Sequence, residues 1–280
     1  MHFQTPRVRS LIFIDGIPVE GTSKGNHMTI AVLLKQVPDT TAKISVNGGR
    51  VDENAVSKWS FSPYDEYALE AALQLKESSG GEIVAITAGP ARCEKLLRDA
   101  AAVGADTLVH VSAENINDLD STQVQKLLAA AVQKSGASVI FCGKQAADTN
   151  AGSTGPGVAE LIGASCVTLV SEVSSDGGGY TATRPSSTGH EKVTASAPCV
   201  FAFDKGVSEM RRPNVRGIMM AKKKPIETWS LGDLGVDIEA NGVNIDSHSP
   251  PAEKPPGQKF EGAESVSTVV SKLRDEANVI

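Results

Sequence analysis

Uninterrupted apolar runs alternate with segments of helical length from residue 28 onward. The runs lack the apolar–polar alternation of a half-exposed strand, and they lie at Met28–Leu34, Ile83–Ala88, Thr107–Val111 and Ser138–Cys142. Such runs are typical of strands buried on both faces of a parallel sheet. Helices are expected over residues 63–77, 92–103 and 121–134, and after a loop within 151–162. The alternation predicts βαβ units.

The start of the first helix carries a signal of its own. Ser62 is predicted to cap it, Pro63 suits its first turn, and Asp65 is expected to complete a capping box.

The pattern changes after residue 165. Short strands separated by turns are predicted within 166–173, 180–184, 191–196 and 199–203, and together they indicate an antiparallel extension or sheet edge. Residues 210–221 are predicted to be a loop rich in Arg and Pro. The expected fold class is therefore α/β, with a doubly wound, mostly parallel sheet, a small antiparallel extension and a C-terminal arm.

Three regions are predicted along the chain. Residues 1–27 are expected to be an N-terminal extension that is disordered or processed; a weak mitochondrial presequence and a mis-called start codon both fit. Residues 28–230 form the α/β body. Residues 231–280 are a polar, Pro-rich arm that ends in an amphipathic helix over residues 264–276. Because such an arm has little to bury against itself, it is expected to wrap around a partner.

Composition excludes several classes of protein. The net charge of −6 argues against nucleic acid as a partner. Aromatic residues make up 4% of the chain, so a flavin held between this chain's own rings is not expected. The four cysteines are widely spaced without a CxxC pair, which favours reduced structural thiols over a metal site. No apolar stretch is long enough to span a bilayer, so an integral membrane protein is not predicted.

The segment after the fourth apolar run is the best candidate for ligand binding, because ligands of open parallel sheets lie beyond the carboxyl ends of the strands. Residues 143–155 combine glycines with the hydroxyls of Ser153 and Thr154, and a helix follows whose N-terminus suits a phosphate. Asp148 and Asn150 are suited to ribose hydroxyls or an adenine edge. An ordinary Gly- and Ser-rich connection that caps a helix explains the same composition.

Familiar catalytic motifs are missing. The chain has no GxGxxG after a strand and no GxxxxGK[ST], HExxH or GxSxG, so neither a catalytic residue nor a metal ligand is predicted. His110 lies in an apolar run and is expected to be a core histidine. An adenylating enzyme remains an alternative, although residues 79–82 precede a strand and lack the Asp and second Ser of an SGGxDS loop.

Seven stretches, in this order and spacing, resemble the electron transfer flavoprotein β family over Met28–Ile280: KQVPDT, SPYDEYALEAALQLKE, AGPA, GKQAAD, STGP, RRPNVRGIMMAKKKPIE and PPG…SKLRDEANVI. The resemblance implies a nucleotide-binding-like fold, similar to adenine nucleotide α-hydrolases. It implies an electron carrier without turnover of its own, paired with an α subunit that holds most of the redox FAD. Its first group also binds AMP in the β subunit.

The resemblance implies a set of AMP contacts. They are Leu33 (through its backbone), Ser62, Pro63, Tyr64, Asp65, Ala88, Gly143, Lys144, Gln145, Ala146, Ala147, Asp148, Thr149, Asn150, Ala151, Gly152, Ser153 and Thr154. Ser62 stands where the family often has Asn, so its contact is expected to be shorter or bridged by water. Bifurcating relatives hold a second FAD here and resemble DGDTAQVG; this chain has DTNAGSTG, with Ala151 in place of their Thr, which favours AMP.

The resemblance also implies a loop that docks on acyl-CoA dehydrogenases and related flavin dehydrogenases. It comprises Arg211, Arg212, Pro213, Asn214, Val215, Arg216, Gly217, Ile218, Met219 and Met220, with Val215 at the anchor position where the family usually has Leu. Electrons are expected to pass on to a membrane quinone oxidoreductase, as in fatty acid β-oxidation, with Val37–Thr40 forming one wall of the flavin cleft. The protein is expected in the cytoplasm of a bacterium or in the mitochondrial matrix of a eukaryote. A bifurcating-type subunit and a stand-alone adenine-nucleotide sensor remain alternatives.

Overall fold

The computed structural model describes residues 28–237, 242–253 and 256–280, so the predictions for residues 1–27 lie outside the described part. The described chain divides into two compact units. The larger one holds the sheet and ends at Asn244, and the smaller one combines Lys43–Val56 with Ile245–Ile280.

A seven-stranded parallel sheet forms the centre of the larger unit, in the order β14-β7-β6-β1-β8-β13-β9. The strands are β1 (Thr29–Leu33), β6 (Glu82–Gly89), β7 (Thr107–Ser112), β8 (Val139–Gly143), β9 (Ser165–Val170), β13 (Cys199–Phe203) and β14 (Glu227–Trp229). The apolar runs of β1, β6, β7 and β8 are buried on both faces, as the sequence predicts, and all five residues of β8 and all five of β13 are buried. The edge strands β9 and β14 keep exposed residues.

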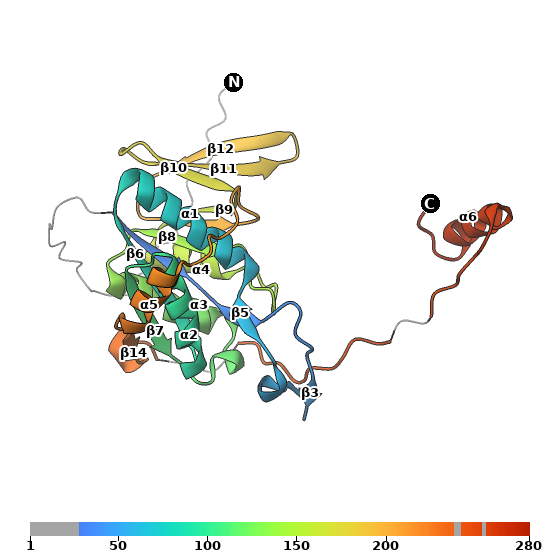
Figure 1. The fold of residues 1–280 in the computed structure, drawn as a ribbon, viewed down its shortest axis with the longest axis horizontal. Coiled ribbons are helices and arrows are strands. Elements are labelled where there is room, and N and C mark those ends of the chain that lie inside the picture. Colours follow the sequence, from blue (N-terminus) through green and yellow to red (C-terminus); the bar gives the residue numbers. More distant parts are fainter. Residues whose placement is uncertain (1–27, 238–241, 254–255) are drawn as a thin grey trace, which may run out of the picture. The chain divides into compact units, whose positions relative to one another are not determined.

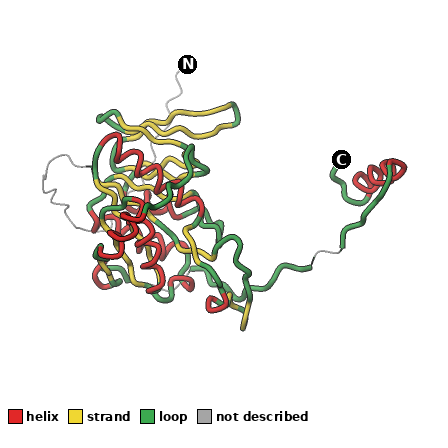
Figure 2. Tube along the Cα trace, viewed as in Figure 1, coloured by secondary structure: helices red, strands yellow, loops and turns green. Residues whose placement is uncertain are grey.

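Helices cover both faces of this sheet (Figure 1). On one face, α1 (Pro63–Ser79) and α2 (Glu94–Val103) pack over a core that includes Phe141, Phe201 and Phe203. On the other, α3 (Ser121–Ser135) and α4 (Thr154–Ile162) pack over Ile86 and Ile140. Figure 2 shows the same layering, with helical tubes on either side of the strands. The predicted doubly wound α/β class is confirmed. Short 3-10 helices lie at Glu53–Ala55, Ala91–Cys93, Ile116–Asp118, Gly232–Leu234 and Ala263–Ser265.

The chain reverses its direction of travel across the sheet between β1 and β8. From β1 it proceeds outward through β6 to β7, and it then returns to place β8 on the other side of β1. This is the topological switch point, where an open α/β sheet leaves a crevice beyond its carboxyl edge.

The strand prediction for residues 166–203 is only half right. β10 (Glu172–Ser175), β11 (Tyr180–Ser186) and β12 (Gly189–Ala195) do form a separate antiparallel sheet. β9 and β13, however, run parallel to each other inside the central sheet. The short turn-separated pattern hides this, because the chain crosses from β9 to β13 through the small sheet rather than through a helix.

The prediction of a loop over residues 210–221 is wrong in its second half. Helix α5 (Val215–Lys223) begins there, capped by the Asn214 side chain, which accepts a hydrogen bond from the Gly217 backbone N–H at 2.7 Å. The Arg and Pro content suggests a loop, but the one proline within residues 210–221, Pro213, lies before the cap, where it does not interrupt a helix.

A two-stranded pair in the larger unit joins β2 (Gln36–Pro38) to β5 (Trp59–Phe61). The smaller unit contains β3 (Val46–Asn47), β4 (Arg50–Val51) and α6 (Val266–Asp275), which confirms the predicted C-terminal helix. Within this unit the Gly49 carbonyl accepts a hydrogen bond from the His248 N–H at 2.8 Å. None of the helices in the described ranges has both the length and the apolar character needed to cross a membrane.

Candidate functional site

The carboxyl ends of β6, β1 and β8 lie side by side at one edge of the sheet, because these strands are parallel neighbours. Three of the predicted cofactor residues, Leu33, Ala88 and Gly143, end or nearly end these strands. The N-terminus of α1 and the segment 144–154 adjoin the same edge through the hydrogen bonds described next. The structure therefore gathers the sequence-predicted cofactor residues at the topological switch point.

Asp65 ties the two central strand ends together. Its buried carboxylate accepts one hydrogen bond from the Lys35 N–H at 2.7 Å and another from the Gly143 N–H at 2.9 Å. A Cβ on Gly143 would lie 2.5 Å from Asp65 Oδ1, so only glycine admits this approach. The predicted capping box is thus wrong: Ser62 makes no side-chain capping bond, and Asp65 bonds to strand ends instead of its own helix start.

The Ser62 hydroxyl instead supports the segment that follows β8. It accepts a hydrogen bond from the Ala147 N–H at 3.3 Å. Within that segment, Gln145 Nε2 donates to Asn150 Oδ1 at 2.9 Å, and Asn150 adopts a left-handed conformation with φ of 51°. Since Asn tolerates this region better than most residues, the tight path of the segment fits its sequence.

Two ion pairs fasten the segment from either side. Lys35, just beyond β1, reaches Asp148 with an Nζ–Oδ2 distance of 2.7 Å. Lys144 contacts Asp204 at 2.8 Å and lies 4.7 Å from the centre of the Tyr64 ring. The hydrogen bond to Asp204 raises the pKa of Lys144. In the sequence, Lys35 stands out only as the first residue of KQVPDT, and Asp204 carries no local signal.

The start of α4 is held from α3. Gln125 Nε2 donates to both the backbone oxygen and the Oγ of Ser153, each at 3.1 Å. Gly155 is buried against β8, where an added Cβ would lie 2.9 Å from Cys142 Sγ. The first turn of α4 has backbone N–H groups that no intrahelical hydrogen bond uses. Sequence reasoning missed Gln125, since only the packing of α3 against α4 brings it here.

A second cluster lies beside Val37–Thr40. The Arg92 guanidinium stacks 3.7 Å from the centre of the Trp59 ring, and its Nη1 donates to Gln36 Oε1 at 2.7 Å. Gln36 in turn donates to the Arg92 carbonyl at 3.2 Å. Trp59 and Arg92 were also missed, because β2–β5 pairing is needed to bring them together.

The pH dependence of stability should report on Asp65. Burial raises its pKa from 3.8 to about 7, against the two N–H donors and Lys35, which lower it. Between pH 4 and pH 7 the unfolded chain therefore releases a proton that the folded chain keeps. The free energy of unfolding should fall over this window by as much as ~4 kcal/mol. Asp65→Asn cannot ionise, so urea titrations at pH 5 and pH 8 should differ less for this variant than for the parent.

The matched control is Asp176→Asn, which changes an exposed carboxylate in the turn before β11 and should keep the parental difference. Asp65→Asn should also be less stable at pH 5 by ~1–3 kcal/mol, because its NH2 group accepts no hydrogen bond, whereas the hydroxyl oxygen of the protonated Asp65 carboxyl still can. An undiminished pH difference in Asp65→Asn would show that another group titrates in this window.

The predicted docking residues form the segment that enters α5 and the first turns of that helix. Val215, Ile218, Met219 and Met220 are exposed by 76%, 41%, 62% and 62%, and we call them the docking surface. A hollow of about 430 Å³ opens along it, between Val215, Arg216, Met219, Met220 and Lys223. Arg211 differs from the others because its guanidinium turns inward onto α1.

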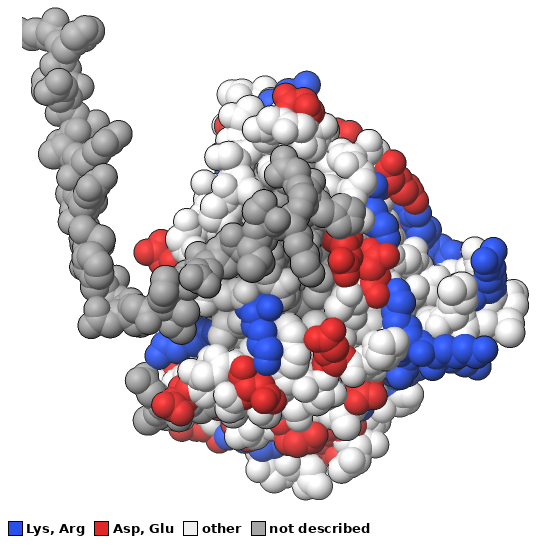
Figure 3. All heavy atoms as spheres, turned by 90° about the vertical axis from the view of Figure 1, so that its left-hand side faces the viewer, with Lys and Arg blue, Asp and Glu red and all other residues white. Residues whose placement is uncertain are grey.

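The remaining candidate chemistry is absent from the described part of the chain. No group of His, Cys, Asp and Glu there has the geometry to hold a metal ion. His110 is buried in β7 with Nε2 2.9 Å from the Gly89 carbonyl oxygen, which confirms it as a core histidine. Cys93, Cys142 and Cys199 are buried cysteines in the reduced thiol form. On the face shown in Figure 3, acidic side chains lie among the basic ones rather than leaving a continuous basic surface.

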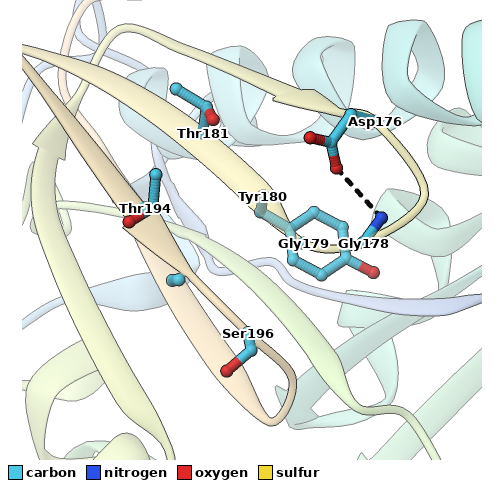
Figure 4. Close-up of a pocket in the computed structure, with 8 residues that line it drawn as sticks. Asp176, Gly178, Gly179, Tyr180, Thr181, Thr194 and Ser196 are labelled. Carbon is cyan, nitrogen blue, oxygen red and sulfur yellow. Dashed lines mark hydrogen bonds between the residues drawn. The ribbon is translucent and has the colours of Figure 1, made fainter.

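A hollow of about 450 Å³ on the small antiparallel sheet is a weaker candidate (Figure 4). Polar groups of Tyr180, Thr181, Thr194 and Ser196 line it. The one carboxylate at its edge, on Asp176, already accepts a hydrogen bond from the Gly178 N–H at 2.9 Å. Since no buried charge points into this hollow, the switch-point crevice is the better ligand site.

Comparison with known proteins agrees with this geometry. Residues 51–234 match the electron transfer flavoprotein domain. The chain is 35% identical over 259 residues to the electron transfer flavoprotein subunit beta of Bacillus subtilis, covering 90% of this chain and 100% of that protein. It is 33% identical over 257 residues to the mitochondrial protein of that name from Arabidopsis thaliana, covering 90% and 100%. With the human one it shares 33% identity over 257 residues, covering 89% and 98%. The chain therefore belongs to the electron transfer flavoprotein β-subunit family.

Proposed function

We propose that this chain is the β subunit of a heterodimeric electron carrier. Together with an α subunit it takes electrons from flavin dehydrogenases such as acyl-CoA dehydrogenases and delivers them to a membrane quinone oxidoreductase. The observation that carries the proposal is the pair of hydrogen bonds by which Asp65 holds Lys35 and Gly143 together at the switch point, in a chain of this family. The chain itself turns over no substrate. It acts in the cytoplasm of a bacterium or in the mitochondrial matrix of a eukaryote.

The nucleotide at the crevice is AMP in this proposal. The N-terminus of α4 fits it, because it offers N–H groups that suit a phosphate. Asp148–Gly152 are exposed and supply polar side chains for the ribose and adenine. Ala151, where bifurcating relatives carry Thr, favours AMP over a second FAD.

FAD is shared with the α subunit, which holds most of it. This division suits a chain with 4% aromatic residues. Val37–Thr40 form one wall of the flavin cleft, and the Arg92–Trp59 stack beside them keeps β2 against β5. The flavin supplies the electron-transfer chemistry when bound, so no acid or base is required from this chain.

Two surfaces of the chain suit protein partners. The docking surface places exposed apolar side chains among Arg216, Lys222 and Lys223, as expected of an anchor with a polar rim that binds a dehydrogenase. The arm and its helix α6 wrap the α subunit in this proposal. Val266, Val270 and Leu273 are exposed by 59%, 37% and 38% on this helix of 10 residues, which is too short to be stable in water by its own hydrogen bonds.

Co-expression with candidate α subunits tests the proposal. The chain should purify in an equimolar complex, and mass spectrometry after denaturation should find FAD and AMP in equal amounts. FAD in place of AMP would make it a bifurcating-type subunit. A stable monomer with exchangeable adenine nucleotide would make it a stand-alone sensor, and pyrophosphate release from ATP an adenylating enzyme.

A further inference from the structure

The segment that leads into α5 is clamped to α1 by one arginine. Arg211 Nε lies 3.0 Å from Glu70 Oε2, and its Nη2 lies 2.8 Å from Glu70 Oε1. The Arg211 backbone N–H also donates to Glu70 Oε2 at 3.0 Å. The other edge of the guanidinium pairs with Glu77, which lies about two helical turns beyond Glu70 on α1. Both the side chain and the backbone of Arg211 are therefore fixed in place.

Glu70 is buried, with only 4% of its surface exposed. Burial by itself raises the pKa of a carboxyl, but the hydrogen bonds from Arg211 and Gln74 outweigh it, so the pKa of Glu70 lies below its ordinary value. The group is thus held as a carboxylate. A buried ion pair of this kind seldom stabilises a fold more than apolar residues of the same volume. Its distinctive contribution is to fix geometry, since two forked groups accept few arrangements.

The far side of α5 is held just as closely. Gly217 packs so tightly on α2 that an added Cβ would overlap the Ala102 carbonyl oxygen. At the end of the helix, Arg98 Nη1 donates to the carbonyl oxygens of Ala221 and Lys224 at 2.9 Å and 2.5 Å. The orientation of α5 is thus fixed from two sides, by α2 along the helix and by Glu70 at the segment that enters it.

We propose that Glu70 is a positioning residue for the docking surface: through Arg211 it sets where the start of α5 presents its apolar side chains. This inference rests on the proposed docking function. Glu70 does not touch the partner, and the docking surface supplies the contacts. Without the Glu70 carboxylate, the apolar side chains of the docking surface should remain but adopt several orientations. Association with the electron donor must then select one of them, which lowers the binding free energy relative to the parent.

The test uses the α–β heterodimer as the substrate of an acyl-CoA dehydrogenase. Glu70→Gln keeps the size of the side chain and removes its charge. It should raise KM for the flavoprotein about tenfold, equivalent to ~1.4 kcal/mol of docking free energy, with kcat changed by less than roughly twofold. Hydrogen exchange at the Arg211 amide should accelerate about tenfold, while amides in the middle of α1 stay protected. Glu160→Gln, at an exposed position on α4, is the matched control and should change neither quantity.

Val215→Glu, which changes the surface itself, distinguishes the possible failures. If Val215→Glu raises KM and Glu70→Gln does not, docking stands and the positioning role of Glu70 is overturned. If neither variant raises KM, the docking surface is misassigned and the positioning role fails with it. If Glu70→Gln has a lower melting temperature but an unchanged KM, the Glu70–Arg211 ion pair only stabilises the fold, and the proposal is also overturned.

Discussion

Gly143→Ala should deprive the chain of its nucleotide. The added Cβ would lie 2.5 Å from Asp65 Oδ1, 2.7 Å from Tyr64 Cβ and 2.9 Å from the Asp65 backbone nitrogen. Tyr64 Cβ and the Asp65 nitrogen can move only with the backbone of α1, so β8 and the start of α1 must separate. Separation breaks the bond between the Gly143 N–H and Asp65, and it moves the segment that Ser62 and Lys35 hold.

Overpacking of this kind costs ~1–3 kcal/mol in a rigid interior. For a body of this size that lowers the melting temperature by roughly 3–10 °C, before the loss of ligand stabilisation is added. AMP recovered from the denatured heterodimer should fall at least about tenfold, a loss of ~1.4 kcal/mol or more in binding. The far-ultraviolet circular dichroism should remain that of the parent at low temperature, because the rest of the sheet is untouched.

Gly232→Ala is the control, since a Cβ at Gly232 lies 3.8 Å from Ser230 Oγ, an ordinary contact, and its backbone is unstrained. It should retain AMP and melt with the parent. A full complement of AMP in Gly143→Ala would place the nucleotide somewhere other than this crevice.

Val215→Glu should slow electron transfer from the dehydrogenase by an order of magnitude or more. Val215 is 76% exposed at the first turn of α5, beside Met219, so the free protein tolerates a carboxylate there. In the complex the same carboxylate would be buried in an apolar pocket without a partner, which is unfavourable. A tenfold lower rate at sub-saturating concentration corresponds to ~1.4 kcal/mol of lost docking free energy.

The readout is the rate of reduction by the dehydrogenase, with dithionite reduction, flavin content and heterodimer yield measured alongside. All three should match the parent. Val207→Glu carries the same change at a side chain that is 74% exposed outside α5, and it should be reduced normally. Equal rates for Val215→Glu and the parent would remove α5 from the docking interface.

The alternation of strands and helices over residues 28–162 was determined by the sequence alone. Runs such as Ile83–Ala88 are apolar throughout, and a strand with that composition is stable only where both faces are covered. Segments with polar faces between them then form the covering helices. The same reasoning placed the ligand segment after β8, because strand ends in a parallel sheet meet at one edge. Hydrophobic periodicity and the succession of elements along the chain are local properties, and a single sequence displays them directly.

Tertiary structure decided which distant groups meet. Asp65 reads as a helix cap because Ser62 lies three residues before it, yet its carboxylate bonds to Gly143, 78 positions away. Arg211 reads as one more basic docking residue, but Glu70, 141 positions away, binds it from α1. The segment 199–203 reads as an edge strand, although the sheet takes it into its centre beside β8. In each case a local alternative was available, but the assembled sheet favoured the long-range partner. An apolar strand is stabilised by burial, and a polar group that becomes buried needs a hydrogen-bond partner wherever the fold supplies one.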